Sequence, residues 1–343
     1  MSGELAKKVR YGIAFARRGL IHTNLQLLYR CNFRCRICDF WREDPGKKML
    51  SVQEVGIIAE KLSQVAPQII SIGGGEPLLH PDIVAVVRVL ARKHFPVMIC
   101  NGWFVTPENA RALFSAGMYE ISVSVDYADP RKHDEQRGGE GAFHRAVRAL
   151  SVLGQNRVKS HQRVHMISVV MDDNLDEIEP LIRLSKKIGV TYLVTLYSDG
   201  RGAKKSREIH PDVSAHLLAL KKKYPGFVAL TGYLGRFSEA VEKGGIGPCY
   251  AGRNLCNVDN YGNISPCIDC MEPEDRAGNL LTDDMGEIVK RLRARFEENR
   301  CRACWTSCRG SIESILYGKD RAANLMDYWR MVRPIPVARA GGA

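Results

Sequence analysis

Apolar residues in this 343-residue chain follow two alternating periods between residues 23 and 223. Short apolar runs, which are typical of strands, are separated by longer segments with apolar positions three and four residues apart, which are typical of helices. Strands are predicted at 23–29, 68–72, 97–100, 120–125, 163–170 and 191–197. Helices are predicted at 51–65, 81–93, 107–116, 141–154, 174–188 and 211–223. This alternation predicts an α/β fold with a parallel sheet and right-handed crossovers.

Two further segments divide the chain. Residues 4–21 are basic and amphipathic, with Leu5, Val9, Ile13 and Leu20 near one face of a predicted helix. This helix is expected either to pack on the sheet domain or to contact an anionic membrane surface or substrate. The glycine-rich segment 244–248 indicates a domain boundary. We therefore expect an N-terminal helix over 1–22, a large domain over 23–243, a small cysteine-rich domain over 244–330 and a flexible tail over 331–343.

Composition and charge narrow the class of protein. No apolar run approaches the roughly 20 residues of a membrane span, and the first 22 residues lack a signal-peptide core. A cytoplasmic location is therefore expected, where eleven cysteines favour metal ligands over disulfides. The net charge of +12 favours an anionic partner or simply keeps the protein in solution. No clear nucleic-acid-binding motif accompanies it.

The first group of cysteines follows the first predicted strand. Cys31, Cys35 and Cys38 have the spacing CxxxCxxC, which puts three thiols on one short loop. Soft sulfur ligands favour zinc, copper(I) or an iron–sulfur cluster. A structural zinc loop or buried free thiols are the alternatives, although a zinc site would normally include a fourth ligand. In α/β barrels, ligands bind on the loops that follow the strands, as this loop does.

The loop 29–41 resembles the signature of the radical S-adenosylmethionine (SAM) superfamily. The resemblance implies a [4Fe–4S] cluster on Cys31, Cys35 and Cys38, with SAM chelating the fourth iron. One electron, from a reductant such as flavodoxin or ferredoxin, would cleave SAM to methionine and a 5′-deoxyadenosyl radical. The implied fold is a partial (β/α)6 TIM-like barrel, open on one side to a large substrate. Ile37 stands where the family often has an aromatic residue.

Candidate SAM-binding residues follow the other predicted strands. Glycines after a strand allow a ligand to approach the backbone closely, and Gly74, Gly75, Glu76 and Pro77 resemble the superfamily's GGEP motif, which implies binding of the SAM ammonium group. Resemblance and strand position also put four polar residues near SAM: Asn101, Ser124, Asp126 and Ser168. The alternatives are a simple turn at Asn101, polar filling of the barrel mouth at Ser124 and Asp126, and a satisfied core role at Ser168. Arg137 is expected either to anchor its loop or to contact substrate.

A second group of cysteines lies beyond residue 248. Its members are Cys249, Cys256, Cys267, Cys270, Cys301, Cys304 and Cys308. The spacing Cys256-x5-Gly262-x4-Cys267 predicts a β-hairpin and resembles the hairpin of SPASM and twitch domains. The run Cys301-x2-Cys304-x3-Cys308 resembles their closing run, with one cysteine fewer.

The resemblance of this second group implies one or two auxiliary [4Fe–4S] clusters with these seven cysteines as candidate ligands. Cys249, Cys267 and Cys308 would share the first cluster, and the assignment of Cys256, Cys270, Cys301 and Cys304 is left open. A zinc site of four thiolates, formed by Cys267, Cys270, Cys301 and Cys304, is the alternative. Asp269 is a candidate general base or a solvated hairpin residue.

The resulting hypothesis is a radical SAM enzyme with a C-terminal SPASM- or twitch-like domain. It would abstract hydrogen from a C–H bond of its substrate, with auxiliary clusters assisting electron transfer. A peptide or protein substrate is expected, with a small molecule or lipid precursor as the alternative. A non-catalytic iron–sulfur or zinc protein is the alternative of another class. The SAM-binding loop at Glu76 argues against it, because an electron carrier does not need such a loop.

Overall fold

The computed structural model describes residues 3–43, 47–199, 201–204, 208–270 and 272–333. Its strands form one nine-stranded sheet in the order β6-β5-β4-β3-β2-β1-β7-β8-β9. The first six strands, all parallel, are β1 (His22–Leu28), β2 (Ile69–Gly74), β3 (Phe95–Cys100), β4 (Glu120–Ser124), β5 (Arg163–Val170) and β6 (Thr191–Leu196). The six predicted strands and their parallel pairing are thus confirmed.

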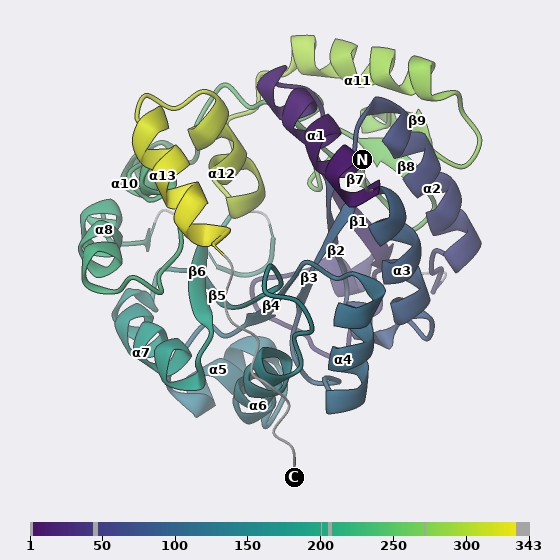
Figure 1. Cartoon of the computed structure of the whole chain (residues 1–343). Coiled ribbons are helices and arrows are strands. Elements are labelled where there is room, and N and C mark those ends of the chain that lie inside the picture. The colour runs from purple at the N-terminus through teal and green to yellow at the C-terminus, as the bar shows by residue number, and fades with distance from the viewer. Residues whose placement is uncertain (1–2, 44–46, 200, 205–207, 271, 334–343) are drawn as a thin grey trace.

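Helices connect these strands and surround the sheet (Figure 1). They are α2 (Val52–Val65), α3 (Ile83–Lys93), α4 (Pro107–Ala116), α5 (Pro130–Arg137), α6 (Ala142–Gln155), α7 (Ile178–Ile188) and α8 (Val213–Lys223). Local sequence explains where several begin. The side chain of Ser51 accepts the N–H of Glu54 in a capping box before α2, and Thr106 caps α4 with Pro107 at its first position.

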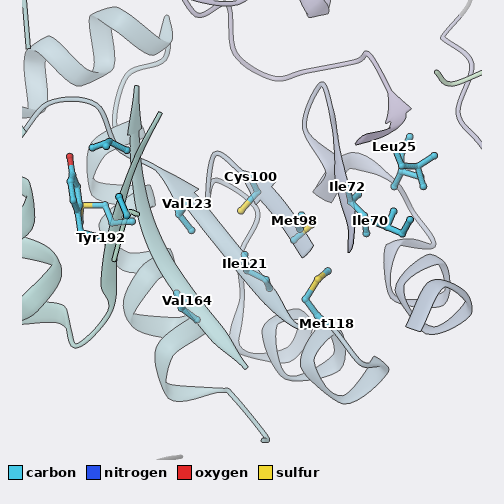
Figure 2. Close-up of a cluster of buried hydrophobic side chains, with 14 of the residues drawn as sticks. Leu25, Ile70, Ile72, Met98, Cys100, Met118, Ile121, Val123, Val164 and Tyr192 are labelled. Atoms are coloured by element: carbon cyan, nitrogen blue, oxygen red, sulfur yellow. The ribbon is translucent and has the colours of Figure 1, made fainter. Parts of the chain in front are cut away.

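Side chains alternate between the two faces of the sheet. Leu25, Ile72, Met98 and Ile121 occupy neighbouring register positions on the face that meets the helices, where they form the main core (Figure 2). Cys100 is buried in the same core, which is where free cysteines are usually found. The other face carries polar residues, among them Gln26, Ser122 and His165, which therefore line the inside of the curved sheet.

The C-terminal region continues this sheet. β7 (Leu255–Val258) pairs in parallel with β1, and β8 (Asn263–Ser265) pairs antiparallel with β7 and with β9 (Gly278–Asn279). The predicted hairpin is confirmed, but its first strand joins the barrel sheet. The helix α11 (Met285–Glu298) packs near β9 and α2. The domain boundary at residue 244 stays a prediction.

The same region also reaches the β6 edge. There α12 (Ser307–Leu316) and α13 (Arg321–Met331) pack against α9 (Thr231–Leu234), which precedes α10 (Phe237–Lys243). The N–H of Ser307 donates to Oγ1 of Thr195 on β6, at 3.0 Å. Residues beyond 248 therefore contact both edges of the six parallel strands (Figure 1). Of the tail predicted over 331–343, residues 334–343 lie outside the described residues.

The N-terminal helix α1 (Gly3–Ala16) crosses the amino ends of β3 and β4. It ends earlier than predicted, because Arg18 adopts a positive φ of 53°. Lys7 attaches it to the sheet domain by donating to the carbonyl oxygens of Ala91 (2.9 Å) and His94 (3.2 Å). The helix thus packs on the barrel, which was one of the two expectations, and the ring of Tyr11 adds a contact with that of Phe95. Leu5, Val9 and Ile13 nevertheless stay exposed, although Leu20 is buried. Among the described residues, no helix has the length and apolar character needed to cross a bilayer.

Candidate active site

The loop with the first three cysteines leaves the carboxyl end of β1 and is held by its backbone. The N–H of Arg34 donates to the carbonyl oxygen of Arg137 (3.3 Å), and the N–H of Arg36 to that of Gln136 (2.9 Å). On its other side, the carbonyl of Arg36 accepts the N–H of Ala203 at 2.7 Å. The end of α5 and the loop after β6 thus fix the path of the chain through Cys31, Cys35 and Cys38.

The thiols of this loop are partly buried. Burial raises the pKa of Cys31 to about 11 and also raises that of Cys38. The N–H of Phe33 donates to Sγ of Cys31 (3.4 Å), and the guanidinium of Arg137 lies 4.0 Å from Sγ of Cys35. Thiols with raised pKa values are protonated at neutral pH, so binding a metal centre here would release protons.

The donor set fits an iron–sulfur cluster. Three thiols on one loop are soft ligands of the kind that such clusters use. Within the described ranges, no three His, Cys, Asp or Glu side chains converge on a single metal ion. A four-iron cluster does not require such convergence, because each thiolate binds a different iron.

The GGEP segment lies directly against the cysteine loop. The N–H of Gly75 donates to the carbonyl of Leu28 (2.7 Å), and the N–H of Glu76 donates to that of Arg30 (3.0 Å). A Cβ on Gly75 would overlap the carbonyl oxygen of Arg30, so only glycine permits this approach. Next to Gly73 and Gly74, the buried Oε1 of Gln26 accepts no hydrogen bond from the described residues. An unmatched acceptor at this point suits a ligand that brings N–H donors, such as an ammonium group.

The carboxylate of Glu76 is buried and acts within the protein. Its oxygens accept the backbone N–H groups of Leu78 (3.0 Å) and Asn101 (2.8 Å). Burial raises its pKa to about 7, against the opposing effect of these hydrogen bonds. The side chain of Asn101 donates to Oδ1 of Asn32 at 2.8 Å. Glu76 and Asn101 therefore connect the ends of β2 and β3 to the cysteine loop.

Asp126 and Arg137 form a buried ion pair beneath the same loop, with 2.6 Å between carboxylate and guanidinium. Oδ1 of Asp126 also accepts the N–H of Val169 at 2.9 Å. Burial raises the pKa of Asp126, and the positive charge of Arg137 opposes that shift. Arg137 thus has an anchoring role, since its guanidinium binds Asp126 and its carbonyl binds the cysteine loop. Ser124 is half-buried on the inward face of β4, near these residues.

Ser168 lies on the opposite face of the sheet. Its hydroxyl donates to the carbonyl of Val125 and accepts from the hydroxyl of Tyr192 at 2.6 Å, in the core between sheet and helices. The expectation that it lies near SAM is therefore not supported. The reason is strand parity, because Ser168 shares its face with Met166 while His165 and Ile167 point inward.

The second group of cysteines is only partly brought together. Hydrogen bonding with Cys270, and then burial, raises the pKa of Cys267. Burial raises the pKa values of Cys249, to about 12, and of Cys308, and the nearby Cys304 adds to both shifts. These neighbour relations link Cys267 to Cys270, and Cys304 to Cys249 and Cys308.

Cys256 and Cys301 lie elsewhere. Sγ of Cys256 is fully buried in the main core, 3.2 Å from Oγ1 of Thr23, and burial raises its pKa to about 12. The parallel register aligns Cys256 with Thr23 on the face toward the helices, which explains this placement. Cys301 is exposed, and its thiol accepts the nearby N–H of Ala303.

Two arginines that the sequence did not single out hold the second group in place. The buried Arg309 donates to the carbonyls of Cys304 (2.8 Å) and Pro248 (3.0 Å) and pairs with Glu313 at 2.8 Å. Arg201, from the loop after β6, binds both carboxylate oxygens of Asp269. Because both oxygens of Asp269 are already engaged by this guanidinium, the case for Asp269 as a general base is weaker. Only the position of Arg309 directly after Cys308 could have signalled its role.

Comparisons with known proteins identify relatives and folds like this one. The model of the Radical SAM superfamily matches residues 25–185. The chain is 30% identical over 307 residues to "Mycofactocin maturase MftC" of Mycobacterium ulcerans, covering 83% of this chain and 80% of that protein. It is 27% identical over 275 residues to "AdoMet-dependent heme synthase" of Methanosarcina barkeri, covering 71% and 75%.

Among solved structures, Streptococcus suis SuiB has a TM-score of 0.65 at 14% identity, covering 83% of this chain and 70% of that one. The protein anSMEcpe with bound AdoMet has a TM-score of 0.64 at 15% identity, covering 91% and 92%. At these identities the structural likeness shows a shared fold.

Proposed function

Because this chain belongs to the radical SAM superfamily, we propose that it is a maturase that modifies a peptide at an unactivated C–H bond. The chain is an enzyme that uses a [4Fe–4S] cluster and SAM and carries a C-terminal auxiliary domain. When bound, these cofactors supply a 5′-deoxyadenosyl radical that abstracts hydrogen from the substrate. The peptide substrate and the individual residue roles below are our proposals.

The cysteine loop and the GGEP segment carry the proposal. Cys31, Cys35 and Cys38 would hold the cluster, and the backbone of Gly74 and Gly75 with Oε1 of Gln26 would receive the ammonium group of SAM. The dense hydrogen bonding of this loop to α5 and β2 supports these roles, because it fixes the loop before any ligand binds. Glu76, Pro77 and Asn101 would position the site through the backbone, while Ser124 and Asp126 would border it from β4.

Five thiols in the second group support one complete auxiliary cluster, which requires four cysteines. We assign Cys249, Cys267 and Cys308 to it, with Cys304 or Cys270 as the fourth ligand. Electrostatic contact of Cys304 with Cys249 and Cys308 favours Cys304. Cys256 and Cys301 are left out of the ligand set, because one lies in the apolar core and the other is exposed.

Two observations favour a peptide over a small molecule. MftC carries the name of a maturase, and SuiB has been solved bound to the precursor peptide SuiA. Beside the cysteine loop, a polar pocket of about 260 Å³ is lined by Arg36, Tyr127, Lys132, Glu135, Gln136 and Asp173. Charges of both signs at the edge of the site suit a chain of polar amides and side chains. A lipid or small-molecule precursor stays the second candidate because of the net charge of +12.

Anaerobic reconstitution tests the proposal. Iron and zinc are counted per chain, SAM and either dithionite or reduced flavodoxin are added, and 5′-deoxyadenosine is measured by mass spectrometry. We expect about eight irons, corresponding to two four-iron clusters, and reductant-dependent 5′-deoxyadenosine. Candidate precursor peptides encoded near the gene are then added, and a change in peptide mass coupled to SAM cleavage is expected. Coupling to a lipid precursor instead would replace the peptide by the second candidate.

A further inference from the structure

Most of the large apolar side chains that stay exposed among the described residues lie on or directly after two helices, at the end of the barrel opposite the cysteine loop. On α1 they include Val9 (46% exposed) and Ile13 (48%), which are four residues apart and therefore share one face. On α13 they include Leu325, Met326 and Trp329, of which Trp329 is 69% exposed. Val332, just after α13, extends the same side.

Both helices are attached to the protein partly by polar contacts. On α1 aromatic side chains contribute as well, since the ring of Tyr11 meets that of Phe95 and Phe15 packs against the main core. Lys7 of α1 is buried and donates to the carbonyls at the end of α3. On α13, Asp327 accepts the N–H of Thr231 (2.8 Å) and Asn324 accepts that of Gly232 (2.8 Å). A surface helix of a globular protein normally turns its apolar stripe to the core. Here the described residues leave much of the apolar surface of both helices uncovered, and an exposed apolar patch of this kind is typical of a surface that meets a partner.

The two helices contribute to one surface. Phe15 and Ala16 from α1 line a groove of about 260 Å³ together with Arg321 and Leu325 from α13. Both helices lie over the amino ends of the strands, since Lys7 reaches His94 before β3 and Arg163 of β5 donates to the carbonyl of Met331 at 3.0 Å. In Figure 1 they lie in front of the sheet, on the same side of the molecule.

Basic residues surround the apolar stripes. Exposed Lys8 and Arg17 flank the stripe of α1, and exposed Arg330 and Arg333 flank that of α13. The acidic residues of the two helices have basic partners within the protein, and these include two of the flanking residues, since Lys8 lies 3.8 Å from Glu4 and Arg330 lies 3.8 Å from Asp327. Glu4 pairs with Lys7 at 2.9 Å, and Asp327 pairs with Lys221 at 3.2 Å.

We propose that α1 and α13 together form a docking face for an anionic phospholipid bilayer. Apolar side chains would enter the boundary of the acyl chains while the surrounding lysine and arginine side chains meet the phosphates. A second copy of this chain is a poorer partner, because a symmetric interface would bring the same positive charges together. Docking at the amino ends of the strands leaves the cysteine loop, at the carboxyl end of β1, accessible to substrate and reductant. The proposal does not depend on the nature of the substrate.

Vesicle flotation with the reconstituted full-length protein tests this surface. We expect binding to vesicles of phosphatidylcholine with phosphatidylglycerol, and binding weaker by about tenfold or more to phosphatidylcholine alone, since each basic residue near an anionic surface adds about fivefold. Raising the salt concentration should weaken binding, because it screens the basic rim. With the wild-type protein, brominated lipid should quench a part of the tryptophan fluorescence that Trp329→Phe removes.

Substitutions of exposed apolar residues by aspartate test whether α1 and α13 form the docking face. Trp329→Asp and Val9→Asp should each lower vesicle affinity by about tenfold or more, because an apolar group no longer enters the bilayer. Ile57→Asp and Tyr261→Asp are controls, since Ile57 (45% exposed) and Tyr261 (49%) are apolar residues elsewhere with an exposure close to that of Val9, and they should bind as wild type. All four variants should keep wild-type production of 5′-deoxyadenosine, which shows that they are folded.

Three results would overturn the proposal. One is no binding of the wild-type protein to either vesicle, which needs no variant to interpret. Another is equal binding to neutral and anionic vesicles without salt dependence. The third is a stable dimer in light scattering that Trp329→Asp dissociates, because the face would then be an interface between two copies.

Discussion

The two cysteine-bearing regions of this protein are built in different ways. The loop 29–41 carries Cys31, Cys35 and Cys38 within eight residues, and the backbone of neighbouring segments holds it. The second group comes from three separate segments between residues 249 and 308, and the side chains of Arg309 and Arg201 hold these together. A ligand set on one loop can be read from spacing. A set assembled from distant segments depends on how those segments pack.

The largest effect is expected for a substitution in the first loop. Cys35→Ala should abolish reductive SAM cleavage and remove about four irons per chain, because the remaining two thiols cannot hold a four-iron cluster. Iron content and 5′-deoxyadenosine are the measurements. Cys100→Ala is the matched control, since Cys100 is buried in the core and should keep both near wild type. Persistent SAM cleavage in Cys35→Ala would refute the assignment of the loop.

At the second group, two substitutions separate a ligand from a core residue. Cys267→Ala should remove about four irons per chain while leaving uncoupled SAM cleavage at the first site. Cys256→Ala should keep the iron and instead lower the free energy of unfolding by roughly 1 kcal/mol, because it removes one buried sulfur from the core. Iron loss in Cys256→Ala, or full iron in Cys267→Ala, would reverse our division of the seven cysteines.

Most of the fold could be predicted from the sequence, because its strands and helices are set by the local periodicity of apolar residues. All six parallel strands and the helices α2, α3, α4, α6, α7 and α8 follow from alternating apolar runs, whereas α5 was not predicted. The hairpin was also predictable, but not its pairing, since Cys256 meets Thr23 across 233 positions of the chain. Because this pairing could not be read from the sequence, the spacing of the cysteines alone made Cys256 a candidate ligand.

Residues whose role depends on which face they occupy were harder to place. Ser168 lies one position away from inward-facing Ile167, and the apolar run 163–170 does not indicate which parity points inward. On α1, the stripe of Leu5, Val9 and Ile13 stays exposed, whereas Lys7 and Tyr11 attach the helix to the barrel. Nothing in the local sequence signalled that a lysine would find carbonyl partners at the end of α3.

The position of the first loop is expected to depend on the buried ion pair between Asp126 and Arg137. Arg137→Gln should lower the free energy of unfolding by about 3–5 kcal/mol, because it leaves the carboxylate of Asp126 buried without its counter-ion. Urea unfolding of the metal-free protein measures this effect. Arg293→Gln removes an exposed pair with Glu297 and should change stability by less than about 1 kcal/mol. Equal effects of the two substitutions would mean that the first loop is not anchored by Arg137.

Glu76, which also holds the first loop in place, should make the free energy of unfolding depend on pH. Its pKa is about 7 in the folded protein, against an ordinary value of 4.5, so the folded state binds this proton more tightly than the unfolded state. The stabilisation is therefore complete below about pH 4.5 and is lost as the pH rises to about 7, a change of about 3 kcal/mol. Unfolding of the metal-free protein between pH 5 and 8 should show this decline. Glu76→Gln should flatten it, and an unchanged slope would count against a buried, proton-binding Glu76.

The smallest effect is expected where the two regions meet. Arg201 follows β6, and its guanidinium both lies over the ring of Phe40, just after the first loop, and binds Asp269 between two cysteines of the second. This ion pair is partly exposed, so Asp269→Asn should lower the free energy of unfolding by no more than about 1 kcal/mol. Iron content should not change, because Asp269 is not assigned as a ligand. Loss of about four irons would instead make its carboxylate the missing fourth ligand of the auxiliary cluster. The second region would then depend on a residue type that counting cysteines cannot reveal.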